Sequence, residues 1–117
     1  MARLLLIGNS RWHWGEWHQG QLRRHWHEAP LGPGAEPPGE VPDLWAAVGP
    51  VPGTLAPWAG RRLRLAGVPL QACPPTLGVD RALAAWGAWS GTAAPVFVAD
   101  AGTALSFTLV DKTGSFL

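Results

Sequence analysis

The sequence predicts an α/β fold in which a mixed sheet is flanked by helices and a strand–turn–strand unit occurs twice. The first occurrence is LLLIGNSRWHW near the start, and the second is VFVADAGTALSF near the end. In both, an apolar run stops at a short polar turn containing Gly and a second strand-like run follows at once. An Ala-rich stretch, VDRALAAWGAW, precedes the second unit and favours a helix. The pattern predicts a duplicated fold whose second copy is truncated.

The composition is that of a soluble domain with a modest core. The chain has 117 residues and a formal net charge of +1, so charge gives no reason to expect nucleic acid or an anionic membrane as a partner. The single cysteine, Cys73, leaves no pair for an internal disulfide. No apolar run reaches the length of a membrane span or of a signal-peptide core, so we expect a cytoplasmic protein.

Three strands are expected at the start of the chain. Arg3–Asn9 is an apolar run that ends in Gly and Asn, which is typical of a buried strand. Arg11–Trp17 and Gln21–His27 alternate with period two and are joined by a turn at His18–Gly20. Pro and Gly are frequent in Ala29–Pro42, which predicts an exposed loop.

Short elements are expected in the middle of the chain. Asp43 is placed to be the N-cap of a short helix at Leu44–Val48. A second short helix is expected around Trp58–Leu65 and a short strand around Val68–Ala72. Gly49–Pro57 contains too many prolines to predict a regular element.

The end of the chain predicts one longer helix and a pair of strands. The helix should run from about Val79 to Trp89, and the strands should cover Pro95–Ala99 and Leu105–Asp111. A turn at residues 112–114 then leads into the start of a third strand at residues 115–117.

Both strand–turn–strand units carry residue types that bind phosphate. The first turn consists of Gly8, Asn9 and Ser10, and the second contains Asp100, Gly102 and Thr103. Gly lacks the Cβ that would keep a phosphate oxygen away from backbone N–H groups, and Ser or Thr adds a hydroxyl donor. An Asp at the end of a strand can hold a metal ion or its water shell beside the phosphates. Ordinary hairpin turns favour the same residues, but two such turns strengthen the phosphate hypothesis.

A third motif, GVDR, lies where a loop enters the predicted helix. It consists of Gly78, Val79, Asp80 and Arg81. Asp80 can accept a proton from a substrate hydroxyl, and Arg81 can hold an anionic group. The alternative is an Asp that stabilises the first helical turn, next to a solvated Arg.

In this order and spacing, IGNSR, PTLGVDRALAA and VFVADAGTALSFTLVD resemble the N-terminal half of type III pantothenate kinases, in the acetate and sugar kinase, Hsp70 and actin superfamily. The form IGNSR-x-HW is similar to the cyanobacterial branch. The resemblance implies an RNase H-like (actin-like ATPase) fold, with residues 1–92 as the first domain and 93–117 as the opening strands of a truncated second. It also implies a cytoplasmic enzyme, a homodimer when complete, that phosphorylates pantothenate with ATP in the first step of coenzyme A biosynthesis.

The resemblance implies a role for each motif. Asp80 would be the general base for the pantothenate hydroxyl, and Gly78, Val79 and Arg81 would lie beside it in the substrate site. The phosphates of ATP would be contacted by Gly8, Asn9, Ser10, Gly102 and Thr103. Asp100 would lie near an activating monovalent cation, K⁺ or NH₄⁺, and Mg²⁺ would accompany ATP.

Two positions depart from the family pattern. The first motif of the family usually reads Asp-x-Gly-Asn-Ser/Thr, and Leu6 stands at its Asp, which removes a carboxylate near the phosphates. Pro74 stands where a substrate-lining residue such as Tyr is frequent. The later Gly-Gly-x-Ile-x-Pro-Gly segment of the family is absent. We therefore expect no kinase activity from these residues alone, and low stability from unpaired strand edges in residues 105–117.

Other functions remain alternatives to a pantothenate kinase. Relatives of the family include accessory factors of transcriptional regulation, so a non-enzymatic regulatory or binding protein similar to Bvg accessory factor is the main alternative. Four histidines near the start suggest a metal site, but no Cys or carboxylate cluster joins them; they are His13, His18, His25 and His27. The tryptophans of the hairpin could stack on single-stranded nucleic acid, although core packing explains them better. Cys73 is interpreted as a small apolar filler.

Overall fold

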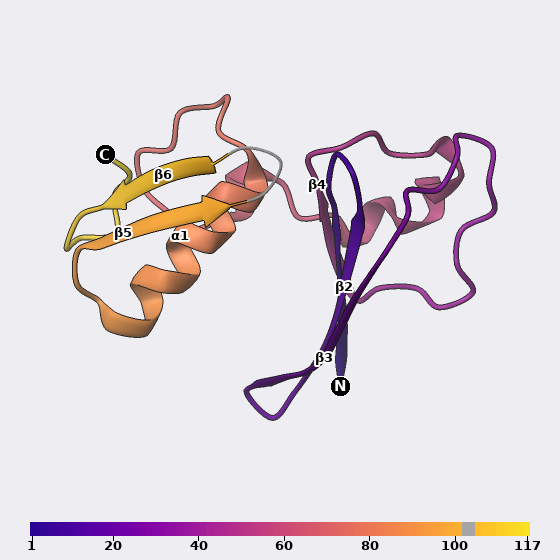
Figure 1. The fold of residues 1–117 in the computed structure, drawn as a ribbon, viewed down its shortest axis with the longest axis horizontal. Coiled ribbons are helices and arrows are strands. Elements are labelled where there is room, and N and C mark those ends of the chain that lie inside the picture. Colours follow the sequence, from indigo (N-terminus) through magenta and orange to yellow (C-terminus); the bar gives the residue numbers. More distant parts are fainter. Residues whose placement is uncertain (102–104) are drawn as a thin grey trace. The chain divides into compact units, whose positions relative to one another are not determined.

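The computed structural model describes residues 1–101 and 105–117, and the chain divides into two compact units, Met1–Leu63 and Arg64–Leu117 (Figure 1). Unit 1 contains a four-stranded sheet of order β3-β2-β1-β4, and unit 2 contains the two-stranded sheet β5-β6 and the helix α1. This mixed sheet with helices confirms the predicted α/β class and is consistent with an actin-like ATPase fold. The domain boundary predicted between residues 92 and 93 rests on the repeated strand pattern and stays a prediction.

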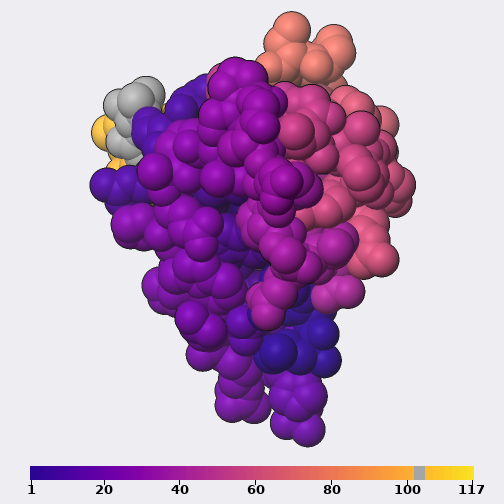
Figure 2. Space-filling model, turned by 90° about the vertical axis from the view of Figure 1, so that its right-hand side faces the viewer, coloured from indigo at the N-terminus to yellow at the C-terminus, as the bar shows by residue number. Residues whose placement is uncertain are grey.

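The three predicted strands at the start are confirmed. They are β1 (Ala2–Ile7), β2 (Trp12–His18) and β3 (Gln21–Glu28), paired antiparallel in succession. Gln19 and Gly20, between β2 and β3, have φ angles of 50° and 75°. Positive φ at both central residues is what a two-residue hairpin turn needs to match the right-handed twist of its strands. The following Pro- and Gly-rich segment, residues 29–42, contains no helix or strand, and its purple to magenta atoms lie at the surface in Figure 2.

One face of this sheet carries the core of unit 1. Its fully buried members are Leu5, Ile7, Trp12, Trp14, Trp45, Leu55 and Trp58. The indole Nε1 of Trp45 donates to the backbone carbonyl of Trp58 at 2.8 Å, so this polar group is satisfied inside the core. Core packing, predicted for the tryptophans of the hairpin, is confirmed for Trp12 and Trp14, whereas Trp26 is half-buried and Trp17 is exposed.

The helix predicted at Leu44–Val48 is wrong, because Leu44–Ala47 forms strand β4, parallel to β1. Asp43, the expected N-cap, pairs with the start of β1 instead. Its N–H donates to the Arg3 carbonyl at 2.8 Å, and its Oδ2 accepts from the Arg3 N–H at 2.7 Å. A ladder to a neighbouring strand outweighs the local preference of so short a segment, since an isolated helical turn is marginal in water.

The structure also differs from the sequence-based expectations in the middle of the chain. The helix expected around Trp58–Leu65 overlaps only the end of a 3₁₀ helix, η1 (Gly53–Arg61), and a second one, η2 (Leu65–Gly67), follows. The strand predicted at Val68–Ala72 does not form, and Gln71 makes only an isolated bridge to Ser115. Pro69 lies within this segment and has no N–H to donate to a ladder, and Pro74 follows two residues after its end.

The longer helix and the strand pair predicted for unit 2 are confirmed. Helix α1 (Val79–Thr92) lies along the hairpin formed by β5 (Val96–Ala101) and β6 (Leu105–Val110), as Figure 1 shows. Ala93, with a φ of 51°, ends the helix in the left-handed conformation, and its N–H donates to the Trp89 carbonyl at 2.7 Å. The third strand expected at residues 115–117 is reduced to isolated bridges.

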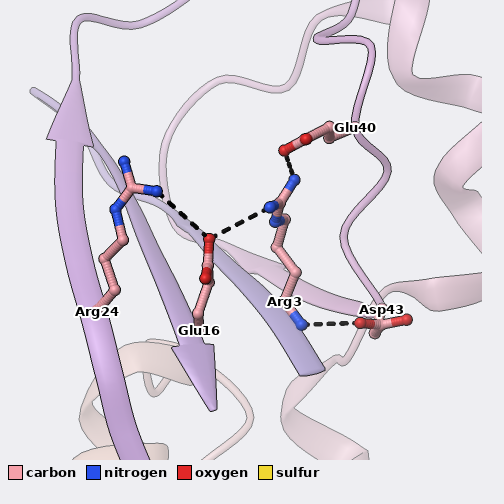
Figure 3. Close-up of polar contacts among 5 residues, drawn as sticks. All are labelled: Arg3, Glu16, Arg24, Glu40 and Asp43. Atoms are coloured by element: carbon pink, nitrogen blue, oxygen red, sulfur yellow. Dashed lines mark hydrogen bonds and ion pairs between the residues drawn. The ribbon is translucent and has the colours of Figure 1, made fainter. Parts of the chain in front are cut away.

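Charged side chains connect β1, β2 and β3 (Figure 3). Glu16 is only 8% exposed, and its Oε1 lies 3.2 Å from Nη2 of Arg3 and 3.7 Å from Nη1 of Arg24. Arg3 also pairs with Glu40, which is exposed. The guanidinium of Arg24 lies 4.4 Å above the ring of Trp26, a cation–π distance. One buried carboxylate therefore neutralises arginines from the two neighbouring strands.

The β5–β6 hairpin leaves one apolar face in solvent. Its large exposed members are Phe97, Leu105, Phe107 and Leu109, of which Phe97 is 61% and Phe107 54% exposed. The rings of Phe97 and Phe107 stack with centroids 5.3 Å apart. Adjacent exposed apolar side chains on a two-stranded sheet favour association.

The buried position of Glu16 predicts a measurable cost for its neutralisation. We expect Glu16→Gln to lower the free energy of unfolding by about 1–3 kcal/mol, because two arginines lose a shared charged acceptor. Glu40→Gln is the matched control and should change it by less than about 1 kcal/mol, since that pair is exposed. Urea denaturation followed by tryptophan fluorescence measures both. Equal effects of the two variants would contradict a special role for Glu16.

The exposed apolar face predicts self-association of the chain. Sedimentation velocity over a range of concentrations should show reversible association of the wild type, and Phe97→Lys should reduce it, because a charge disfavours burial of this face. Val41→Lys replaces another exposed apolar residue and serves as the control. A wild type that stays monomeric at every concentration would contradict this expectation.

Candidate functional site

The first predicted phosphate turn is a tight hairpin between β1 and β2. The N–H of Gly8 donates to the Arg11 carbonyl at 2.9 Å, so only Asn9 and Ser10 lie between the paired residues. Both are exposed, whereas Gly8 is half-buried. The turn therefore presents a short stretch of backbone and two polar side chains at the end of the central strand of unit 1.

Gly49 supports this turn from β4 and was not singled out from the sequence. The N–H groups of Val48 and Gly49 both donate to the Ile7 carbonyl, at 2.9 and 3.2 Å. A Cβ added at Gly49 would lie 2.7 Å from the carbonyl carbon of Gly8 and 3.1 Å from Cα of Asn9. Only glycine allows this approach. The sequence contains a signal for this role, a Gly directly after an apolar run, but it can be interpreted only when Leu44–Ala47 is known to be a strand.

Leu6 occupies the position where the family pattern has an Asp, and its cross-strand neighbours are His13 on β2 and Ala46 on β4. Leu6 pairs with His13 across β1 and β2, and His13 pairs with His27 across β2 and β3. Paired residues lie on the same face of a sheet. A hydrocarbon side chain beside an imidazole does not suit direct Mg²⁺ binding, which needs oxygen ligands.

The GVDR motif opens α1, as the sequence predicts. Gly78 is the N-cap in extended conformation, Val79 is buried, and Asp80 is half-buried in the first turn. Oδ1 of Asp80 accepts the N–H of Arg81 at 2.8 Å, which satisfies one of the free amides of the helix start. Among the residues that the structure describes, Oδ2 of Asp80 has no hydrogen-bond partner. One oxygen thus orients the carboxylate and the other is left to accept a proton.

Arg81 is anchored to β6. Its Nη2 donates to Oγ1 of Thr108 at 2.9 Å and to the carbonyl of Phe107 at 2.8 Å, and its Nε lies 3.3 Å from the same hydroxyl. Thr108 is buried. The guanidinium therefore ties the first turn of α1 to the hairpin, and its Nη1 makes no hydrogen bond to the described residues.

Asp100 lies half-buried near the end of β5, opposite Ser106 of β6. Ser106 and Thr108 are two residues apart on one strand, so Asp100 and the anchor of Arg81 share a face of the hairpin. Within the described part of the chain, no hydrogen bond or ion pair reaches the Asp100 carboxylate. A half-buried carboxylate of this kind suits a cation. Gly102 and Thr103, the other members of the second predicted turn, lie outside the described residues.

Each unit therefore holds part of the predicted site. Unit 1 carries Gly8, Asn9 and Ser10; unit 2 carries the GVDR motif and Asp100. In residues 1–101 and 105–117, no three side chains of His, Cys, Asp or Glu come together as metal ligands. None of the described helices is long and apolar enough to cross a membrane.

Two side chains in unit 2 have shifted pKa values, and both have structural causes. The hydroxyl of Thr113 and the N–H groups of Ser115 and Thr113 donate to Asp111 and lower the pKa of its carboxyl. These bonds hold the turn after β6. Burial raises the pKa of the Cys73 thiol, which keeps it protonated and fits its interpretation as an apolar filler.

Comparison with known proteins identifies relatives of the whole chain. A family model described as type III pantothenate kinase matches residues 54–117. The type III pantothenate kinase of Thermosynechococcus vestitus is 44% identical over an alignment of 115 residues, which covers 96% of this chain and 45% of that protein. The enzyme of the same name from Synechococcus elongatus is 40% identical over an alignment of 133 residues, which covers 99% of this chain and 54% of the relative. The chain spans about half the length of the curated relatives it matches.

The close approach of Gly49 to the first turn predicts a selective effect of a methyl group there. We expect Gly49→Ala to destabilise unit 1 by about 1–3 kcal/mol, because the added Cβ meets backbone atoms that cannot move without breaking the Ile7 hydrogen bonds. A Cβ at Gly34 meets nothing within 4 Å, so Gly34→Ala is the control. The measurement is urea denaturation of both variants, and a Gly49→Ala protein as stable as its control would refute this packing argument.

Proposed function

Since the chain belongs to the type III pantothenate kinase family, we propose that it forms the first half of an enzyme that transfers the γ-phosphoryl group of ATP to the primary hydroxyl of pantothenate. The product is 4′-phosphopantothenate, in the first step of coenzyme A biosynthesis. The observation that carries the proposal is the Asp80 carboxylate, oriented by the N–H of Arg81 at the start of α1. Similarity over nearly the whole chain to named kinases supports it.

Asp80 is the general base in this proposal. A carboxylate that contacts the attacking hydroxyl accepts its proton as the bond to phosphorus forms. Arg81, with Gly78 and Val79, lines the substrate site, and its anchor on Thr108 limits its freedom. In phosphoryl transfer, most of the protein's contribution is positioning and charge neutralisation, so rigid supports of this kind matter.

The two turns contact the phosphates of ATP in this proposal. Backbone N–H groups and hydroxyls of the turn formed by Gly8, Asn9 and Ser10 act from unit 1, and Gly102 and Thr103 act from the second turn. Asp100 holds the activating monovalent cation, K⁺ or NH₄⁺, which contributes positive charge near the phosphates. Mg²⁺ arrives with ATP and is not held by the first turn, where Leu6 offers no oxygen. The complete enzyme is cytoplasmic and a homodimer.

A non-enzymatic regulatory or binding role is the second candidate. The observation that favours it is Leu6, because the missing carboxylate weakens the metal handling expected of a kinase. Asp80 and Asp100 favour the kinase, since a protein that only binds has no need of an oriented general base.

The decisive experiment joins this chain to the C-terminal half of the Thermosynechococcus vestitus relative and measures ADP formation with pantothenate. We expect turnover by the joined protein, none by the 117 residues alone, and a fall in kcat of about 10²–10⁴-fold for Asp80→Asn, since the amide cannot accept the proton. Glu28→Gln, the same change at an exposed carboxylate, should have no effect. If the joined protein bound pantothenate and ATP without turnover, the binding role would replace the kinase; if Asp80→Asn turned over normally, Asp80 would not be the base.

A further inference from the structure

We propose that Arg11, His13 and His27 form an anion-binding cluster beside the first turn, which holds the polyphosphate chain of a nucleotide directly by side-chain charge. The cluster extends the phosphate site of the proposed function and rests on it. It supplies positive charge at a turn where Leu6 leaves no carboxylate to recruit a metal ion.

The three side chains lie together at the end of the sheet that carries the turn. Gly8 and Arg11 close the turn, and a Cβ added at Gly8 would lie 3.8 Å from Cδ2 and Nε2 of the His13 ring. Nη1 of Arg11 is 3.4 Å from Nε2 of His27. The His13 and His27 rings meet edge to face with centroids 6.2 Å apart. The imidazole of His13 thus lies against the turn, and His27 and Arg11 adjoin it.

The cluster is accessible and is not neutralised by the protein. All three residues are exposed. Within residues 1–101 and 105–117, the ion pairs of unit 1 involve Arg3, Arg24 and Arg61, and none reaches the cluster. The strand register decides which charged groups face it. Residues paired across the strands form a row, and the row of His13 and His27 also contains Leu6 of β1 and Ala46 of β4. The next row on this face contains Leu4, Gly15 and His25. The carboxylates of Glu16 and Glu28 belong to rows of the opposite face.

The contact between Arg11 and His27 links anion binding to protonation. Arginine can donate to Nε2 only when this nitrogen carries no proton. A protonated imidazole beside a guanidinium is stable when an anion lies between the two cations, and the anion gains a second charged donor. Histidine changes charge in the range in which enzymes work, so affinity for an anion should rise as the pH falls.

The geometry favours a polyphosphate over a carboxylate as the anion. The exposed residues Asn9 and Ser10 lie in a tight turn of the kind that accommodates phosphate oxygens. The planar fork of Arg11 matches phosphate, and two imidazoles extend the row of donors over more than one phosphoryl group. A single carboxylate would leave most of these donors without an acceptor.

The test measures binding of sodium tripolyphosphate to the 117-residue chain by calorimetry at low salt, with ring signals of the histidines followed by NMR. We expect binding at about pH 6 to be at least threefold tighter than at about pH 8, with shifts confined to His13 and His27. Arg11→Ala should weaken binding at least threefold, and His27→Gln should weaken it and flatten its pH dependence. His18→Gln, at the far turn of the hairpin, is the matched control and should behave as the wild type.

Other outcomes overturn the cluster. Absence of tripolyphosphate binding would do so, as would binding that Arg11→Ala and His27→Gln leave unchanged. Circular dichroism of each variant checks folding, and Arg11→Lys, which keeps the charge, should retain most of the affinity. The joined kinase separates this inference from the proposed function. If the joined protein turns over but His27→Gln changes neither the KM for ATP nor its pH dependence, the cluster is refuted and the proposed kinase activity is supported. If the chain binds tripolyphosphate at the cluster but the joined protein is inactive, the proposed kinase activity is refuted.

Discussion

The pairing of β1 on both of its edges is the constraint on which unit 1 depends. β2 runs antiparallel to it on one side and β4 runs parallel on the other, and the Ile7 carbonyl accepts two N–H groups from the end of β4. This fixes where the chain must turn at Gly8, and it brings Gly49 against that turn. The tryptophan core then covers one face of the sheet, and the opposite face carries Leu6, His13 and His27. The position of the proposed phosphate turn therefore follows from backbone pairing more than from its own residues.

A single arginine has a comparable place in unit 2. Two roles are assigned to Arg81. The sequence predicts that it lines the substrate site, and the structure shows its guanidinium hydrogen-bonded to β6. The two roles are compatible, because a side chain held at Nη2 and Nε can still present Nη1. The anchor connects the first turn of α1, which carries Asp80, to the hairpin that carries Asp100. Buried Thr108 makes the connection costly to break, since its hydroxyl would lose its charged donor.

The departure from the family pattern at Leu6 fits the side chains that surround the first turn. A carboxylate at residue 6 would bring negative charge to a row that contains His13 and His27, and Leu6 brings none. Phosphates carry their own negative charge, so a site can balance it with metal ions or with cationic side chains. Here the residues of the row favour cationic side chains at the first turn, while the cation-suited Asp100 belongs to unit 2.

By itself, the sequence determined the elements whose signals are long or periodic: the first three strands, α1 and the hairpin after it, together with the GVDR motif at the helix start and the family itself. Tertiary structure alone decided that Leu44–Ala47 is a strand, that Val68–Ala72 is not, and that Arg81 is anchored to β6. It also revealed the role of Gly49 and the contact between Arg11 and His27. The reason is physical. A segment of four or five residues has a local preference worth less than one or two hydrogen bonds to a neighbouring strand, and contacts between distant residues leave no periodic trace in the sequence.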